Sequence, residues 1–252
     1  MTTGIKHLYV HVPFCASICY YCDFCRWIYS DDLCDRWLKR LKQEIEENCK
    51  DPYETIYIGG GTPTVLSCDQ LENLFKMISF YAEDVKEYTI EVNPESLSEE
   101  KIQLFQKYGI NRISMGVQSS DNTILKSLNR HHTYEDAVEK ITLLRKHGLN
   151  NISIDLMYSL PGQDLAQLKR TLNDVLKLNQ TIYTIHKYVD GSLKPFDDGS
   201  HLIYINGSAE DDGTDIWKLV HDLRCPKADE MYFPRLAARV KFLKEDEEGV
   251  AI

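Results

Sequence analysis

The sequence lacks any long apolar run, and no stretch of about 18 residues is apolar enough to form a membrane-spanning helix. The amino-terminal stretch MTTGIKHLYVHVPFC also lacks the basic segment, apolar core and cleavage site of a secretory signal. We therefore expect a cytoplasmic protein without a transmembrane segment. In a reducing compartment, clustered cysteines serve more often as metal ligands or catalytic groups than as disulfides.

Basic residues are scarce as well. The 252 residues include 29 Lys and Arg against 39 Asp and Glu, which gives a net charge of −10. A broad nucleic-acid surface needs many cationic side chains to neutralise phosphates, so no nucleic-acid partner is expected. The hydrophobic content of 43% is ordinary for a globular protein. The length suits one large α/β domain or two small ones.

The first 179 residues alternate between short β-rich runs and helical patterns. The runs cover residues 7–14, 55–60, 87–93, 112–118 and 151–158, and the helical patterns cover about 32–49, 68–81, 98–108, 133–147 and 164–178. Ser67 with Gln70 and Thr133 with Asp136 have the spacing of capping boxes. This alternation predicts parallel strands joined by right-handed crossovers, either as a doubly wound sheet or as a (β/α) barrel.

The pattern changes after residue 179. Asp-Gly turn signals and hairpin-like runs follow, and then helical patterns at about 214–223 and 228–247. We therefore predict a core domain over 1–179 and a small α+β tail over 180–252. The run TIYTIHKYV, residues 181–189, alternates with period two. It is expected to dock as a substitute strand on the edge that five parallel strands would leave open.

Four of the eight cysteines lie between Cys15 and Cys25. Cys15, Cys19 and Cys22 have the spacing C-x3-C-x2-C, and thiolates suit iron–sulfur clusters, zinc and Cu(I). A structural zinc site usually has two ligand pairs separated by a longer spacer, and no second pair follows here. Three close thiolates favour a [4Fe–4S] cluster with one iron open. Zinc and a chance grouping of buried thiols are the alternatives.

The stretch YVHVPFCASICYYCDF resembles the cluster motif of radical S-adenosylmethionine proteins. Within that superfamily, the residues of this stretch are most similar to those of the oxygen-independent coproporphyrinogen III oxidase and haem chaperone HemW family. The resemblance covers about residues 5–179, roughly half of a full-length member. It implies a partial (β/α) barrel of five βα units and an open iron that chelates S-adenosyl-L-methionine. It also implies that electron transfer cleaves this cofactor to a carbon-centred radical, chemistry that the cofactor pair carries.

The resemblance also implies the site residues. The cluster ligands would be Cys15, Cys19 and Cys22. The residues that would contact the cluster and S-adenosyl-L-methionine are Tyr9, Tyr21, Phe24, Gly60, Gly61, Thr62, Glu91, Gln118, Arg130 and Asp155.

Elementary chemistry agrees with several of these assignments. The glycines of IYIGGGTP have no Cβ, so a ligand can approach the backbone closely. Glu91, Gln118 and Asp155 lie within or at the ends of apolar strands, where polar groups of a (β/α) barrel face its mouth. A buried carboxylate needs a partner, and Arg130 could supply one. Structural salt bridges are the alternative reading of these residues.

Three positions need separate treatment. The oxidases resemble C-x3-C-x2-C-x-C, whereas this chain has Phe24 at the last position and Cys25 one residue later. We therefore treat Cys25 as a non-ligand. Ser159 stands where the family's YGLPGQ turn usually has glycine. His131 and His132 precede a helix and are expected to be exposed, although either could touch haem.

The resemblance implies a HemW-like haem chaperone that acts in porphyrin metabolism. The alternatives are an oxygen-independent coproporphyrinogen III oxidase and a truncated chimera that binds a cluster without turnover, so whether the chain is an enzyme stays open. The implied partners are haem or a porphyrin, an electron donor such as flavodoxin or ferredoxin, and haem-receiving apo-proteins. From about residue 182 the tail resembles the end of a PD-(D/E)XK nuclease family transposase without its catalytic core, so nuclease activity is not expected.

Overall fold

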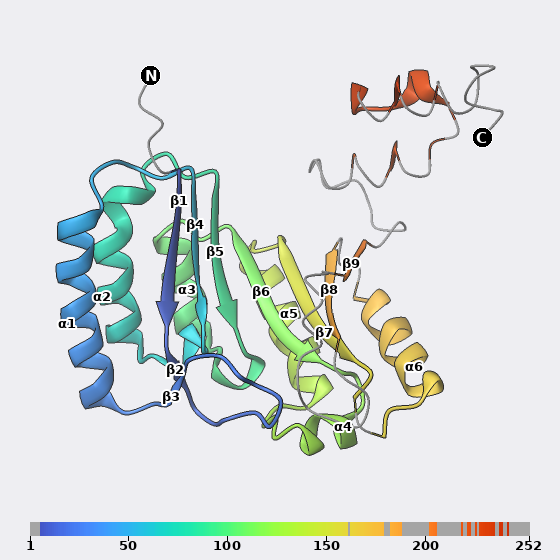
Figure 1. The fold of residues 1–252 in the computed structure, drawn as a ribbon, viewed down its shortest axis with the longest axis horizontal. Helices are drawn as coiled ribbons and strands as arrows, with labels where there is room; N and C mark the ends of the chain where they lie inside the picture. Colours follow the sequence, from blue (N-terminus) through green and yellow to red (C-terminus); the bar gives the residue numbers. More distant parts are fainter. Residues whose placement is uncertain are drawn as a thin grey trace.

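The computed structural model describes residues 6–160, 162–178, 182–187 and 202–205, together with residues 218, 221–222, 225, 227–234, 237–238 and 241 near the carboxyl end. Seven strands of the described residues form the main sheet (Figure 1). In spatial order they are β1 (His7–Val12), β4 (Thr55–Gly60), β5 (Glu87–Val92), β6 (Arg112–Gln118), β7 (Ile152–Tyr158), β8 (Ile182–Lys187) and β9 (Leu202–Ile205). A second, two-stranded sheet pairs β2 (Phe14–Cys15) with β3 (Trp27–Ile28).

Helices connect the strands of the main sheet. The α-helices are α1 (Asp31–Asn48), α2 (Cys68–Ile78), α3 (Glu99–Lys107), α4 (Asn122–Ser127), α5 (Tyr134–Lys146) and α6 (Leu165–Leu176). Short 3-10 helices are η1 (Pro63–Val65), η2 (Ser79–Ala82), η3 (Pro94–Ser96) and η4 (Ala228–Glu230). No helix among the described residues is both long and apolar enough to cross a membrane.

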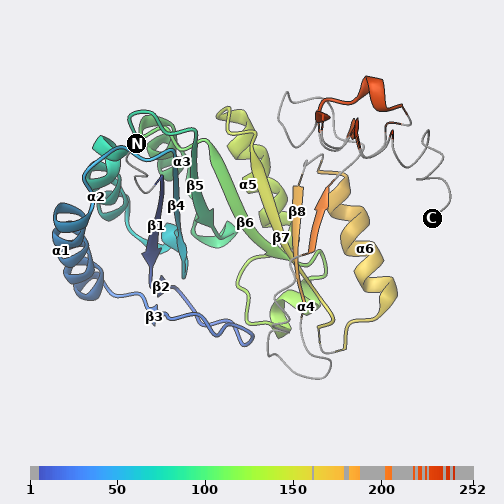
Figure 2. The ribbon, with the colours of Figure 1, turned by 45° about the horizontal axis from the view of Figure 1, so that its top comes forward.

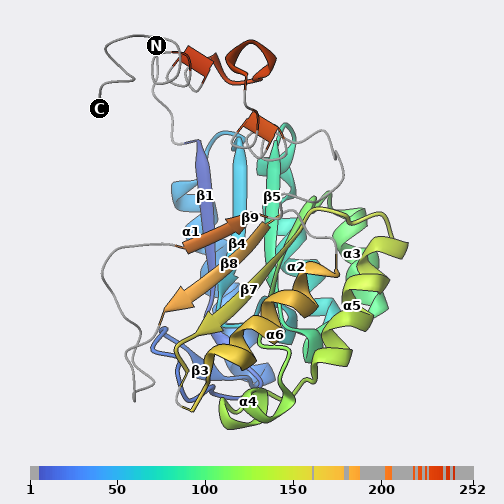
Figure 3. The same cartoon turned by 90° about the vertical axis from the view of Figure 1, so that its right-hand side faces the viewer.

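The predicted α/β architecture is confirmed. Strands β1, β4, β5, β6, β7 and β8 pair in parallel, and β9 pairs antiparallel to β8. The first five strands of the main sheet are each followed by a helix, as five successive βα units require. The sheet curves but stays open in the described part of the chain, because β1 and β9 are its two edges (Figures 1 and 3). This is a partial barrel.

The two faces of the sheet differ in chemistry. Side chains such as Val10, Ile58 and Ile90 point to one face and join Phe75 of α2 and Phe105 of α3 in one continuous apolar core. Helices α1, α5 and α6 contribute to the same core, and Figure 3 shows α3, α5 and α6 together on one side of the sheet. Because side chains alternate along a strand, the intervening residues of β4 to β7 face the opposite, polar side.

Local signals in the sequence placed the helix ends well. Ser67 and Thr133 form the predicted capping boxes with Gln70 and Asp136. The helix α4 was not predicted, because its six residues are too few to show a period. Its start is fixed by Asp121, whose side chain accepts hydrogen bonds from two backbone N–H groups of the first turn.

The secondary structure predicted for the carboxyl-terminal part differs from the structure at one helix start and is otherwise largely untested. The helix predicted from residue 228 is wrong at its start, because Ala228–Glu230 forms a 3-10 turn that ends at Met231. Helical residues resume at Pro234, where the fixed φ of proline suits a first turn. The helix predicted at 214–223 and the rest of the tail fall largely outside the described residues.

The predicted substitute strand is confirmed. Strand β8 pairs in parallel with β7 over six residues, from the Ser153–Ile182 pair to the Tyr158–Lys187 pair. The sheet therefore continues past residue 179, although the division of the chain into domains 1–179 and 180–252 stays a prediction. By pairing with β7, β8 removes an open parallel edge.

Deletion of residues 180–252 should lower the thermal unfolding midpoint and promote aggregation, because the backbone groups of β7 lose their partners on that edge. Light scattering and thermal melts measure both effects. Deletion of residues 206–252 is the matched control, since it retains β8 and β9 and should behave much more like the full chain. Equal melting and solubility for the two deletions would contradict the stabilising role of β8.

Candidate functional site

The cysteine loop, defined as residues 15–25, lies at the carboxyl ends of the parallel strands. Cys15 belongs to β2 and is buried, whereas Cys19 and Cys22 lie in the connection from β2 to β3 and are half-buried. The Cys22 N–H donates to the Cys19 carbonyl (3.1 Å), which closes a turn between them. Figure 2 shows this connection running beneath the strands toward α4. There the Tyr20 N–H donates to the Leu128 carbonyl (3.3 Å).

Backbone hydrogen bonds fix Cys15 to the end of the sheet. The Gly61 N–H donates to the Val12 carbonyl (2.8 Å), and the Thr62 N–H donates to the Phe14 carbonyl (2.7 Å). A Cβ on Gly61 would lie 2.5 Å from the Phe14 oxygen and 3.0 Å from Cys15 Sγ. Only glycine therefore allows this approach, and the glycine run determines where the first thiol lies.

The thiols share one environment. Burial raises the pKa of Cys15, the Thr62 hydroxyl opposes this, and the nearby Cys22 and Cys19 thiols raise it further. Burial also raises the pKa of Cys22. Without a ligand these two groups therefore hold their protons more tightly than free thiols, whereas binding to iron would deprotonate them.

Among the residues described, no three His, Cys, Asp or Glu side chains converge to hold a single metal ion. A [4Fe–4S] cube binds each thiolate at a different iron, so its ligands need not meet at one point. The assignment of Cys15, Cys19 and Cys22 as cluster ligands stays a prediction.

Glu91 of β5 is held by the neighbouring strand. Its carboxylate accepts hydrogen bonds from the Tyr57 hydroxyl (2.7 Å) and from the Gly60 N–H (3.1 Å). Burial raises the pKa of Glu91, and these two hydrogen bonds oppose the rise. A Cβ on Gly59 would lie 2.7 Å from a Glu91 oxygen, and one on Gly60 would lie 2.5 Å from His11 Nδ1. The space that the glycines leave at these two positions is thus filled by the chain's own side chains.

Asp155 of β7 lies on the same polar face of the sheet as Glu91. It accepts a hydrogen bond from the Ser114 hydroxyl of β6 (3.2 Å). Burial and then the charge of Glu91 raise the pKa of Asp155 to about 7. Burial is the main cause that raises the pKa of Tyr57 of β4, and the charges of Glu91 and Asp155 raise it further. Two partly buried carboxylates on one face favour a ligand that brings hydroxyl or cationic groups.

Gln118 and Arg130 lie at the end of β6 and after α4. Gln118 is buried with a φ of 69°, which a residue with a side chain rarely adopts, and its Oε1 has no hydrogen-bond partner in the described part of the chain. Arg130 is 9% exposed, and its Nη2 donates to the Gly116 carbonyl (2.8 Å). Its Nε likewise has no partner among the described residues. The prediction that Gln118 and Arg130 contact S-adenosyl-L-methionine stays a prediction, and each side chain has a polar atom that could make such a contact.

The expectation that both histidines after Arg130 are exposed is wrong for His132. His131 is exposed, but His132 is buried between Glu95 Oε2 (3.1 Å from Nδ1) and the Val117 carbonyl (3.3 Å from Nε2). Burial alone would raise the pKa of Glu95, but His132 and Arg130 outweigh it and lower this pKa to about 2. His132 thus holds Glu95, the carboxylate that also faces Arg130.

The aromatic residues predicted at the site lie in different environments. Tyr9 is 56% exposed, and its hydroxyl contacts His11 Nδ1 (2.9 Å). Phe24 is 67% exposed and stands three residues before β3. Tyr21 packs against the small apolar cluster of Ile124, Leu128, Met157 and Leu160. Cys25 is exposed, and its carbonyl accepts a hydrogen bond from His11 Nε2 (3.0 Å).

Several residues of the site were absent from the sequence prediction. Tyr57 and His11 share the polar face with Glu91, and strand alternation could have indicated both. Asn93 follows β5 and contacts both Thr62 and Arg130. Ser159, predicted at a glycine position, has a φ of 60° and so adopts the backbone that the glycine would provide.

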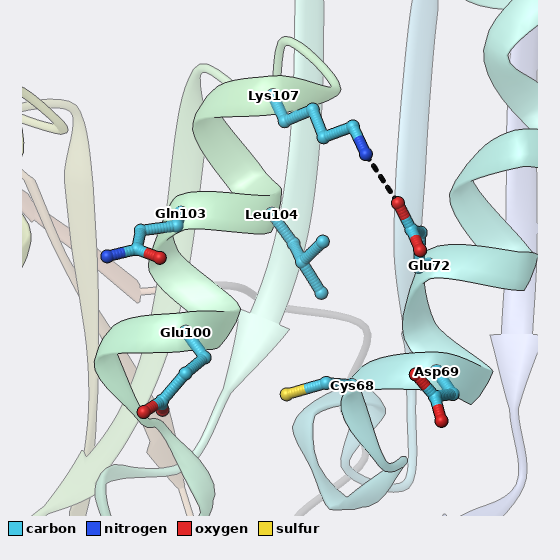
Figure 4. A pocket seen from close by; sticks show the side chains of 7 residues that line it. All are labelled: Cys68, Asp69, Glu72, Glu100, Gln103, Leu104 and Lys107. Carbon is cyan, nitrogen blue, oxygen red and sulfur yellow. Dashed lines mark hydrogen bonds and ion pairs between the residues drawn. The ribbon is translucent and has the colours of Figure 1, made fainter.

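A separate shallow groove of about 310 Å³ lies between α2 and α3 (Figure 4). An ion pair between Lys107 and Glu72 (2.5 Å) closes one end of it. The groove contains none of the predicted site residues. Its lining residues are Cys68, Asp69, Glu72, Glu100, Gln103, Leu104 and Lys107.

A loop with C-x3-C-x2-C spacing at the carboxyl ends of a partial (β/α) barrel is the arrangement expected of cluster-binding α/β proteins. The sequence pattern of the Radical SAM superfamily matches residues 9–175, which is more than half of the chain, and the chain belongs to this superfamily. The family implies a [4Fe–4S] cluster and S-adenosyl-L-methionine.

Curated relatives show which members of the superfamily this chain resembles. The chain is 38% identical to the heme chaperone HemW of Bacillus subtilis over 73% of this chain and 51% of that protein. It is 35% identical to HemW of Lactococcus lactis over 85% of this chain and 57% of that protein. The chain thus spans little more than half the length of these relatives.

A solved structure supports the same fold. The coproporphyrinogen III oxidase HemN of Escherichia coli, a radical SAM enzyme, matches with a TM-score of 0.68 and 30% identity. The match covers 73% of this chain and 44% of that one. The α/β partial barrel is therefore shared with an established member of the superfamily.

Replacement Asp155→Asn should change how stability depends on pH. The folded-state pKa of about 7 lies above the value of about 3.9 expected in the unfolded chain. The contribution of Asp155 is therefore fully present below about pH 4 and is lost as the pH rises to about 7. The variant cannot titrate here, so its free energy of unfolding should fall less than that of the wild type over this range.

Urea unfolding at several pH values between these limits measures the effect. Asp69→Asn, at an exposed carboxylate, is the matched control and should keep the pH profile of the wild type. Parallel profiles for wild type and Asp155→Asn would show that Asp155 does not carry the raised pKa.

Proposed function

We propose that this chain is the cluster- and cofactor-binding part of a HemW-like haem chaperone. The observation that carries the proposal is the anchored loop that presents Cys15, Cys19 and Cys22 at the carboxyl ends of the strands, beside a polar face with Glu91 and Asp155. The likeness to HemW over this region supports the chaperone rather than another member of the superfamily.

The residues present fit the cluster. Three free thiols gather on one loop, and soft thiolates are the ligands of iron–sulfur clusters. The Thr62 hydroxyl and an Arg130 guanidinium nitrogen each lie 3.7 Å from a thiol sulfur, of Cys15 and Cys19 respectively. Donors at this distance stabilise the charge that a thiolate ligand carries.

The residues also fit S-adenosyl-L-methionine. Once bound, the cluster and this cofactor supply one-electron reduction of a sulfonium. The carboxylates of Glu91 and Asp155 can accept hydrogen bonds from an ammonium or from hydroxyl groups. Gln118 Oε1, which has no hydrogen-bond partner among the described residues, offers a further acceptor, and Arg130 can donate to a carboxylate. The Gly60–Thr62 loop brings backbone close to the same region.

Haem is the proposed cargo. Exposed aromatic side chains lie on the cysteine loop and at the start of β3, and their flat faces suit a porphyrin; they include Tyr20, Phe24 and Trp27. The proposed partners are apo-proteins that receive the haem and an electron donor of the flavodoxin or ferredoxin type. The thiol ligands need a reducing compartment, so a cytoplasmic location is part of the proposal.

The second candidate is an oxygen-independent coproporphyrinogen III oxidase, favoured by the structural match to the Escherichia coli enzyme. Phe24 counts against it, because the oxidase motif has cysteine there, whereas the thiol of this chain lies at Cys25. A chain that binds a cluster without turnover is the third outcome.

Anaerobic reconstitution with iron and sulfide tests the ligand set. Cys19→Ala should lose nearly all of the cluster absorbance, because a ligand is removed. Cys25→Ala is the matched control on the same loop and should keep the absorbance of the wild type. Retained absorbance in Cys19→Ala, or its loss in Cys25→Ala, would show that the assignment of ligands is wrong.

Haem and coproporphyrinogen III, offered separately to the reconstituted protein, distinguish the candidates. The chaperone predicts a stoichiometric haem spectrum and no decarboxylation when S-adenosyl-L-methionine and a reductant are added. Formation of vinyl groups, detected by mass spectrometry, would establish the oxidase instead. Phe24→Ala should weaken haem binding several-fold, because it removes an exposed ring proposed to stack on the macrocycle.

A further inference from the structure

A continuous chain of hydrogen bonds joins two of the thiols. The Thr62 hydroxyl lies 3.7 Å from Cys15 Sγ and 3.0 Å from Asn93 Nδ2. Asn93 Oδ1 lies 2.9 Å from Arg130 Nη2, and Arg130 Nη1 lies 3.7 Å from Cys19 Sγ. Asn93 is therefore the central link between the two sulfur atoms.

Chemistry fixes the direction of each bond. Arginine has donors only, so Asn93 must present its carbonyl oxygen to Arg130 and its NH2 group to Thr62. The Thr62 oxygen then accepts from Asn93, and its own proton is free to point at Cys15. Both ends of the chain consequently donate toward sulfur.

The arginine at one end is held firmly. Its side chain is 4% exposed, and it donates to the Gly116 carbonyl as well as to Asn93. Glu95 lies 3.9 Å from Arg130 Nη2 and is itself bound to His132 (3.1 Å). Residues from three strand ends and from the segment after α4 therefore converge on Asn93 and its neighbours.

We propose that Asn93 is a positioning residue that aligns Thr62 and Arg130 so that each donates a hydrogen bond to a cluster-ligand sulfur. This inference rests on the proposed cluster. Hydrogen bonds to the sulfurs help to set the reduction potential of an iron–sulfur cluster. They stabilise the reduced, more negative state more than the oxidised one, so the Asn93 network raises the potential.

Asn93→Leu tests the proposal, because leucine has a similar size and neither donor nor acceptor. The variant retains all three cysteines and should bind wild-type amounts of iron. Its midpoint potential, measured by a redox titration followed by EPR, should be lower than that of the wild type, and the EPR signal of its reduced cluster should change.

The matched control is Asn111→Leu. Asn111 bridges neighbouring segments at the opposite end of the same strands, where it accepts from the Tyr88 N–H (2.8 Å) and donates to the Lys86 carbonyl (3.0 Å). Its replacement should lower stability but leave the potential and the EPR signal unchanged.

A second pair of variants decides the matter should Asn93→Leu fail to fold. Thr62→Val removes the hydroxyl and should lower the potential, and Thr62→Ser restores it and should regain the wild-type value. Wild-type potentials in Asn93→Leu or Thr62→Val, with the cluster present, would overturn the positioning role alone. A wild-type protein that binds no cluster would overturn the proposed function and this inference together.

Discussion

The contact on which the site depends is the pair of backbone hydrogen bonds from the turn after β4 to the last residue of β1 and the first residue of β2. The Gly61 and Thr62 N–H groups hold the chain on either side of Pro13, and so they place Cys15 at the end of the sheet. A side chain at Gly61 would collide with the Phe14 carbonyl, so the contact requires glycine. The chain beyond the other end of the loop is tied to the same residue, because the Tyr29 N–H donates to the Cys15 carbonyl (2.9 Å).

The sheet separates stability from function. Its apolar face packs against five helices and forms the continuous core, whereas its polar face holds Glu91 and Asp155 at a cost in desolvation. The polar face also holds the strained φ of Gln118 and the Gln118 and Arg130 atoms that have no partner in the part of the chain that the structure describes. Such costs often concentrate at functional sites, and the proposed cofactor would supply partners for these groups.

The sequence predicted features that depend on residues close together along the chain, such as the five βα units and the helix cap at Ser67. The alternation of residues 181–189 even predicted the docking of β8. It could not predict contacts that depend on register between strands, so Asn93 was missed. His132 was expected at the surface because it precedes a helix, but Glu95 and the Val117 carbonyl enclose it. Helix α4 was too short to detect.

Iron and acid-labile sulfide content after anaerobic purification tests the central claim most directly. An anchored set of three thiolates that holds a cubane predicts about four iron atoms and about four sulfides per chain. Zinc in place of iron, or a protein free of any metal, would contradict the account.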